Sequence, residues 1–364
     1  MNTTDPGAEN SAAKSRVDTS LVRSFAIVAI VNSHMEYYYP LPEVAIGGLV
    51  GLALFFMATG MGMNASRNTR QLGFFKWYGL RILRIHPSVI ACALIIQIAI
   101  FGEWRHWHFG IPVTGSFWNA LAAIFRNDYV DNLVYPLSTY HFLNKILVFY
   151  VPLYFYVRWG GNYKHVVGIG GGVVLCGVTA IPDIRLQLAT DSPLRSGDLN
   201  EPFLWSIFFL MTLLGVWASD NPWLFRKRSN ALTFTCVIVL AVLYLGTKFA
   251  MAKLGIFTEG FLLLYLFGIL LSLALVVALA DEALLSRIKK SGAAVRWCTI
   301  GLGTISLEIY LVHTQMYMHR VGREFAFPLS FFCFCVASVA GSLVVHWIAN
   351  RIRERLQLLF AEGP

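Results

Sequence analysis

Continuously apolar runs, separated by shorter polar connections, dominate the chain. They are roughly 20 residues long, the length that an α-helix needs to cross about 30 Å of hydrocarbon. Because they do not alternate between apolar and polar residues, they favour helices over the strands of a membrane barrel. Ten runs are expected to span a membrane: residues 21–38, 44–63, 87–101, 139–157, 165–181, 203–218, 231–246, 260–280, 299–318 and 329–349. The pattern predicts an all-α, polytopic membrane protein with about ten transmembrane helices.

The polar ends of the chain define the expected domain organisation. Residues 1–19 are expected to form a disordered cytoplasmic tail, residues 20–350 the ten-helix transmembrane domain, and residues 351–364 a basic cytoplasmic tail. No small-residue cleavage site follows the first run, so that run is interpreted as a helix and not as a signal peptide.

Composition and charge agree with this class and indicate an orientation. Of 364 residues, 57% are hydrophobic and 13% are charged, and the net charge is +9. With the N-terminus inside, 20 lysines and arginines fall on the cytoplasmic side of the ten spans and 8 on the other side. This bias predicts a multi-pass protein of the plasma (inner) membrane with both termini in the cytoplasm. It also accounts for the net charge, so no nucleic-acid partner is expected.

The cysteines indicate neither a disulfide nor a metal site. All six lie in or at the edge of predicted spans, where cysteine usually behaves as a small hydrophobic residue. No metal is therefore expected.

The first run carries two ionisable residues on one helix face. Arg23 and His34 are 11 residues apart, which corresponds to about three turns and a rise of about 16 Å. Arg23 either anchors the helix end by snorkelling or takes part in a site. His34 is either a packed, hydrogen-bonded imidazole or a general base.

The second run and the connection after it contain small, aromatic and basic residues. The small and aromatic ones are Gly51, Phe55, Phe56 and Gly60, and they suit either close helix packing or the approach of an extended ligand. The basic ones are Arg67, Arg70, Lys76, Arg81 and Arg84. Arg81 and Arg84 share a helix face and could bind phosphates, although ordinary cytoplasmic loop charge is the alternative.

Further polar residues are candidates for a cavity or an acceptor site. They are Glu36, Asp128, Asp131, His141, Lys145, Glu308 and His313. An intramembrane carboxylate such as Glu308 requires a partner, and it is a candidate either for a catalytic role or for a structural ion pair. The two aspartates lie in a predicted outer loop, where they could bind acceptor hydroxyls.

Several of these features resemble the acyltransferase-3 family of membrane O-acyltransferases. They occur in the family's order: the Arg23 and His34 spacing, GLALFFMATG at 51–60, LRILRIHP at 80–87, YHFLNKIL at 140–147 and ISLEIYLVH at 305–313. The resemblance implies that His34 is the essential histidine, with Arg23 as its paired arginine. It places Arg81 and Arg84 at the CoA side, and Gly51, Phe55, Phe56 and Gly60 in the second-span motif. Ala53 and Thr59 depart from residues common in the family.

The resemblance also implies a reaction. An acyl group, acetyl in the usual case, would move from cytoplasmic acyl-CoA to a hydroxyl of a carbohydrate or glycolipid at the extracytoplasmic side. The transfer would proceed directly or through an acyl-histidine. The expected partners are acyl-CoA as donor, this acceptor, the bilayer and envelope biosynthesis proteins. A secondary transporter and a scaffold for envelope glycan export are the alternatives, and the sequence leaves open the acceptor's identity and acetyl against succinyl.

Overall fold

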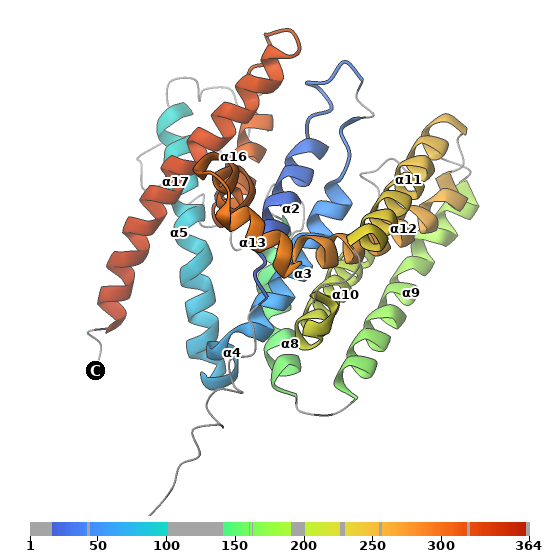
Figure 1. Ribbon diagram of the computed structural model, residues 1–364, viewed down its shortest axis with the longest axis horizontal. Coiled ribbons are helices and arrows are strands. Elements are labelled where there is room, and N and C mark those ends of the chain that lie inside the picture. Colours follow the sequence, from blue (N-terminus) through green and yellow to red (C-terminus); the bar gives the residue numbers. More distant parts are fainter. Residues whose placement is uncertain are drawn as a thin grey trace, which may run out of the picture.

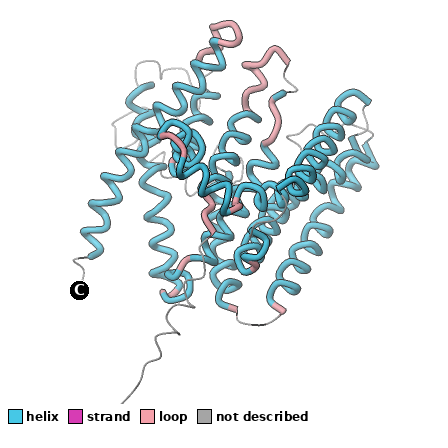
Figure 2. The backbone as a smooth tube through the Cα atoms, viewed as in Figure 1, coloured by secondary structure: helices cyan, strands magenta, loops and turns pink. Residues whose placement is uncertain are grey.

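A computed structural model describes residues 17–41, 44–100, 141–159, 161, 163–190, 201–225, 230–254, 257–318 and 321–361. Figure 2 shows helices joined by short loops, with no strand in these ranges. In chain order the elements are α2 (Ser20–Ser33), α3 (Gly48–Ala65), α4 (Arg67–Gln71), α5 (Phe74–Ile100), α8 (His141–Arg158), α9 (Lys164–Thr190), α10 (Glu201–Asp220), η3 (Pro222–Phe225), α11 (Asn230–Leu254), α12 (Phe257–Leu279), α13 (Glu282–Lys290), α14 (Ala293–Arg296), η4 (Trp297–Gly301), α15 (Leu302–Thr304), α16 (Ser306–Met318) and α17 (Leu329–Ala361).

The all-α membrane class is confirmed, but the number of spans differs from the ten predicted. Within the described ranges, six helices are long and apolar enough to cross a membrane: α3, α9, α10, α11, α12 and α17. A seventh is reached if the bent segments Ala293–Thr304 and Ser306–Tyr317 count as one span. The first apolar run forms only the 14-residue α2, and α8 carries polar side chains, Asn144 and Lys145, that are buried in the protein. The remaining predicted spans fall in α2, α5 and α8, which do not meet the same criteria of length and composition.

α3 lies at the centre of the bundle, whereas α9 and α11 lie at its edge. The apolar window of α3 is 67% buried, against 11% for those of α9 and α11. In Figure 1, α5 and α17 run side by side on one flank, and α9, α11 and α12 form the other. The exposed valines and leucines of α9 and α11 are therefore suited to contact lipid.

Glycines bring the central helices into backbone contact. A Cβ at Gly60 of α3 would collide with the carbonyl of Thr212 on α10, and a Cβ at Gly215 of α10 would collide with the carbonyl of Met57 on α3. Gly51 makes a comparable approach to α2, against Ala26 O. Such close approach maximises dispersion contacts where water cannot drive association.

The segment before α16 is sharply bent, and the last helix is longer than its apolar run. The helical segments on either side of Ile305 meet at 81°, so the chain changes direction inside the bundle. α17 runs to Ala361, so residues 351–361 are helical.

The amphipathic helix α13 lies against the start of the described chain. Lys289 of α13 forms an ion pair of 2.7 Å with Asp18. Partial burial alone would raise the pKa of the Asp18 carboxyl, but hydrogen bonds from Lys289 and from the backbone N–H of Ser20 bring it below its usual value. Asp18, just before α2, is thus held beside a basic connection between two apolar helices.

Candidate functional site

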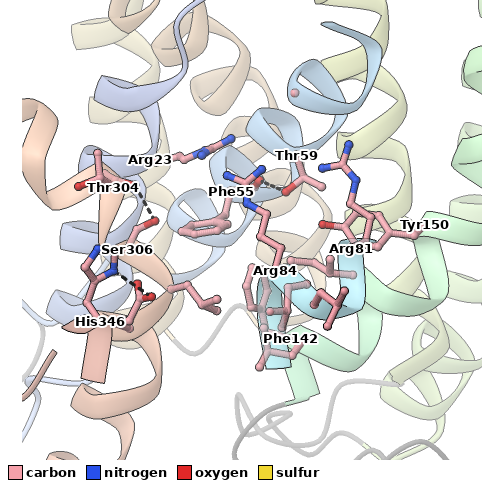
Figure 3. Close-up of a pocket in the computed structure, with 18 of the residues that line it drawn as sticks. Arg23, Phe55, Thr59, Arg81, Arg84, Phe142, Tyr150, Thr304, Ser306 and His346 are labelled. Carbon is pink, nitrogen blue, oxygen red and sulfur yellow. Dashed lines mark hydrogen bonds and ion pairs between the residues drawn. The ribbon is translucent and has the colours of Figure 1, made fainter. Parts of the chain in front are cut away.

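A cavity of about 540 Å³ lies among α2, α3, α5, α8, α15, α16 and α17. Four arginines line it, and we call it the arginine cavity: Arg23 of α2, Arg81 and Arg84 of α5, and Arg353 of α17. Figure 3 shows Arg23, Arg81 and Arg84 around the same space. Arg81 and Arg84 share one face of α5, as their spacing predicts.

The cavity carries a large excess of positive charge. In the described part of the chain, no carboxylate lies within ion-pair distance of any of these four arginines. The guanidinium carbon of Arg81 instead lies 5.4 Å from the ring centre of Trp77 and 5.7 Å from that of Tyr150. Aromatic faces hold a guanidinium in place without neutralising it. The cavity therefore suits an anionic ligand.

Glu308 is the carboxylate on the cavity wall, and it is engaged by two partners. It is 3% exposed, accepts a hydrogen bond of 2.8 Å from Ser88 Oγ and lies 3.2 Å from Nδ1 of His346. Asn350 lies against the other ring nitrogen of His346, at 2.9 Å, and contacts Arg353 in turn. Glu308 is therefore placed to hold α5 and α17 against α16.

His346 is a cavity residue that the sequence analysis did not single out. It lies on the wall opposite Arg81 and Tyr150 (Figure 3). The sequence feature that could have identified it is the position of a histidine inside an apolar run, LVVHWIAN. The motif resemblance did not include it.

His34 is the C-cap of α2 and lies outside the arginine cavity, beside His313 and Tyr317 of α16. Its ring centre is 5.4 Å from that of His313 and 5.3 Å from that of Tyr317. We call His34 and His313 the histidine pair. Arg23 and His34 thus occupy two neighbouring sites at opposite ends of α2, one inside the cavity and one beyond it.

Two aromatic rings connect the cavity to the histidine pair. Phe142 of α8 lines the cavity, and its ring centre is 4.9 Å from that of Tyr310 on α16. Tyr310 in turn lies 5.7 Å from His313. We call Phe142 and Tyr310 the aromatic partition, because their rings form a chain of contacts from the cavity lining to His313.

The second-span residues divide between packing and lining. Gly51 and Gly60 pack against α2 and α10 and do not line the arginine cavity. Phe56 is fully buried, with its ring stacked on Phe208 at 4.9 Å. Phe55 does line the cavity, together with Thr59 one turn later.

The other predicted site residues are dispersed. Arg70 donates to Asn64 Oδ1 at 3.2 Å, and Lys76 is exposed. Lys145 is 1% exposed, with its Nζ 5.3 Å from the ring centre of Trp205. Glu36 is exposed and accepts from the hydroxyl of Tyr317 at 3.1 Å. Asp128, Asp131 and the side chains of Arg67 and His141 lie outside the described residues.

Helical packing and the cavity define a class of protein, a polytopic membrane protein with a cationic internal cavity beside a histidine pair. The family comparison makes the class specific. The family model described as an acyltransferase domain matches residues 17–347, and the chain belongs to the acyltransferase-3 family. No curated protein and no solved structure matches the chain. The protein is thus a membrane acyltransferase, and the matched range includes every predicted site residue.

Proposed function

We propose that this acyltransferase takes its acyl group, acetyl in the simplest case, from acyl-CoA at the cytoplasmic side. It transfers the group to a hydroxyl of a carbohydrate or glycolipid at the extracytoplasmic side. The observation that carries the proposal is the set of four cavity arginines without a carboxylate partner in the described part of the chain. CoA carries several phosphate charges at one end and a thin thioester arm at the other, which suits a cationic site that is bordered by aromatic rings.

Arg353 extends this phosphate site beyond the family match. It lies six residues past the end of the matched range, yet it lines the same cavity as Arg23. One of its terminal nitrogens donates to Arg84 O at 3.1 Å, and its buried Nε has no hydrogen-bond partner among the described residues. A buried donor without a partner is costly, and a phosphate oxygen would satisfy it.

Contacts among the basic connections support the proposed sidedness. Asp220 at the end of α10 binds Lys164 at 2.6 Å and Asn64 at 2.8 Å, which joins three segments that the charge bias assigns to the cytoplasm. The cavity arginines Arg81 and Arg84 follow Asn64 closely in the chain. This arrangement favours entry of the donor from the cytoplasm. We place the protein in the plasma (inner) membrane.

In the proposed reaction His34 is the general base. It takes the proton of the acceptor hydroxyl while the hydroxyl oxygen forms a bond to the thioester carbon. The carbon–sulfur bond then breaks, and the CoA thiolate leaves and receives the proton from His34. Positioned proton transfer of this kind typically contributes about 10² to 10⁴ in rate. In this proposal the aromatic partition opens for the thioester to reach His34. While it is closed, the partition excludes water from the cavity side of His34.

A vesicle assay tests the function. The full-length protein is reconstituted in liposomes, acetyl-CoA is supplied outside, and a panel of sugars and glycolipids is enclosed. Release of CoA and mass-spectrometric detection of an O-acetylated acceptor inside are expected with the native chain and are lost in His34→Ala. Movement of a solute without consumption of acetyl-CoA would overturn the proposal in favour of a transporter. Full turnover in His34→Ala would remove the catalytic assignment.

A further inference from the structure

His313 is a fully buried histidine with one ring nitrogen committed to the backbone. Its Nδ1 lies 2.8 Å from the carbonyl oxygen of Ile309, one turn earlier in α16. A carbonyl can only accept, so Nδ1 carries the hydrogen. In the neutral ring, Nε2 is therefore a bare acceptor with a fixed position.

That Nε2 atom is buried and has no hydrogen-bond partner among the described residues. A buried acceptor without a partner is uncommon and destabilising, so a donor that reaches it during function would be favoured. His34, in ring contact at 5.4 Å, is the neighbouring side chain with an N–H of the matching kind. Because the contact of Nδ1 with Ile309 O holds the ring of His313, rotation of the His34 ring is the movement that would bring the two nitrogens within hydrogen-bond reach. Such contacts often tighten only when substrate is bound.

Glu36 and Glu308, the two carboxylates of the described chain that the sequence analysis singled out, are engaged by other residues. Glu36 is exposed and accepts from Tyr317, and Glu308 is held by Ser88 and His346 on the cavity side. A neutral acceptor also avoids the cost of a second buried charge beside a base that becomes positive during the reaction. The Nε2 atom of His313 is such a neutral acceptor, and no other described residue occupies it.

We propose that His313 is the positioning residue of His34. Its Nε2 accepts the N–H of His34, so the other nitrogen of His34 presents its lone pair to the acceptor hydroxyl. When that nitrogen takes the hydroxyl proton, the resulting imidazolium is stabilised by the same hydrogen bond. This inference rests on the proposed role of His34 as base and identifies the group that orients it.

Two variants separate this role from a structural one. In His313→Gln, the amide oxygen can take the place of Nε2 as an acceptor. In His313→Asn, the shorter amide can take the place of Nδ1 and donate to Ile309 O, but it leaves no acceptor at the place of Nε2. In the vesicle assay with acetyl-CoA, His313→Asn should lower kcat about 100-fold or more with an unchanged KM for acetyl-CoA. His313→Gln should retain kcat within about tenfold of the native chain. Equal kcat values in the two variants, or a change confined to KM, would overturn the proposal.

A spectroscopic readout keeps this test independent of turnover. Nitrogen NMR of the full-length protein with ¹⁵N-labelled histidine, in lipid nanodiscs, reports whether each ring nitrogen is bare, protonated or hydrogen-bonded. The signal lost in His313→Gln identifies His313, and its Nε2 resonance should shift toward that of a free acceptor in His34→Ala, which has no side-chain donor. An Nε2 resonance that is the same in the native chain and in the His34 variant would overturn the pairing, even if acyl transfer itself is confirmed. A coupled pair in a protein that consumes no acetyl-CoA would instead reject the function and retain the pairing.

Discussion

The hydroxyl of Ser88 donates a hydrogen bond of 2.8 Å to the buried carboxylate of Glu308 and thereby joins α5 to α16. A nitrogen of Arg353 on α17 lies 3.4 Å from the same hydroxyl. Three helices thus meet at one serine on the wall of the arginine cavity. The junction joins α5, which carries two of the cavity arginines, to α16 and α17.

Ser88→Ala should destabilise the protein, because it leaves a buried carboxylate with one fewer donor. We expect a loss of about 1–3 kcal/mol in unfolding free energy, measured as a lower unfolding temperature in detergent. Ser338→Ala is the matched control, since the Ser338 hydroxyl is buried without a hydrogen-bond partner among the described residues. Equal losses in the two variants would show that Ser88 contributes only its volume.

Substitution of the cavity arginines should weaken donor binding more than the chemical step. Removing a charge-assisted hydrogen bond to phosphate costs about 1.5–3 kcal/mol, so Arg353→Gln should raise the KM for acetyl-CoA roughly 10- to 100-fold. Arg351→Gln is the control, because Arg351 is exposed, pairs with Glu354 and does not line the cavity. An unchanged KM for Arg353→Gln would exclude this residue from the donor site.

The phosphate responsible can be identified with dephospho-CoA thioesters. If Arg353 binds the ribose phosphate of CoA, acetyl-dephospho-CoA should lose affinity in the native chain but lose little more in Arg353→Gln. Additive losses would place Arg353 against another part of the donor. High salt should raise the KM of the native chain more than that of the variant.

Gly215→Ala should disrupt the contact between α3 and α10. A methyl group there would collide with the backbone of Met57, and neither backbone can retreat without separating the two central helices. We expect a loss of folded, monodisperse protein in size-exclusion chromatography. Gly177→Ala on α9 is the control, because nothing lies within 4 Å of a Cβ at that position. Native behaviour of Gly215→Ala would contradict the described packing.

Phe142→Leu should change the acyl groups that the enzyme accepts. A smaller side chain in the aromatic partition leaves more room beside Tyr310, so turnover of butyryl-CoA should rise relative to acetyl-CoA. Phe149→Leu is the control, because Phe149 is buried against Phe56, Trp205 and Phe209 and does not line the cavity. Competition between the two thioesters, followed by mass spectrometry, gives the ratio. The same ratio in the two variants would remove Phe142 from the acyl path.

The sequence predicted the helical class because apolar runs of bilayer length leave few other folds open. The number of helices that meet the criteria of length and composition is lower than the number of runs, because α2 ends after 14 residues and α5 and α8 carry polar residues. The sequence left two roles open for Gly60, because close helix packing and the passage of a ligand favour the same small residue. The structure shows the close approach to Thr212.

The site was predicted in part. The spacing of Arg81 and Arg84 was enough to place both on one face, and the structure adds the cavity that they line. Arg353 and His346 could not be found in this way, because they reach the cavity from α17, which is distant in sequence from α5. Glu308 was singled out as a carboxylate inside an apolar run, but its contacts with Ser88 and His346 depend on the packing of three helices.

The continuation of α17 to Ala361 bears on how the gene can be shortened or fused. The apolar pattern ends near residue 350, so a truncation there would be expected to remove only a polar end. The truncated protein would keep all contacts between residues that precede the truncation point. It would lack the guanidinium of Arg353 and the donor that this group provides to Arg84 O. Such a product could insert correctly and still bind its donor poorly, so an inactive truncation would say little about the residues that remain.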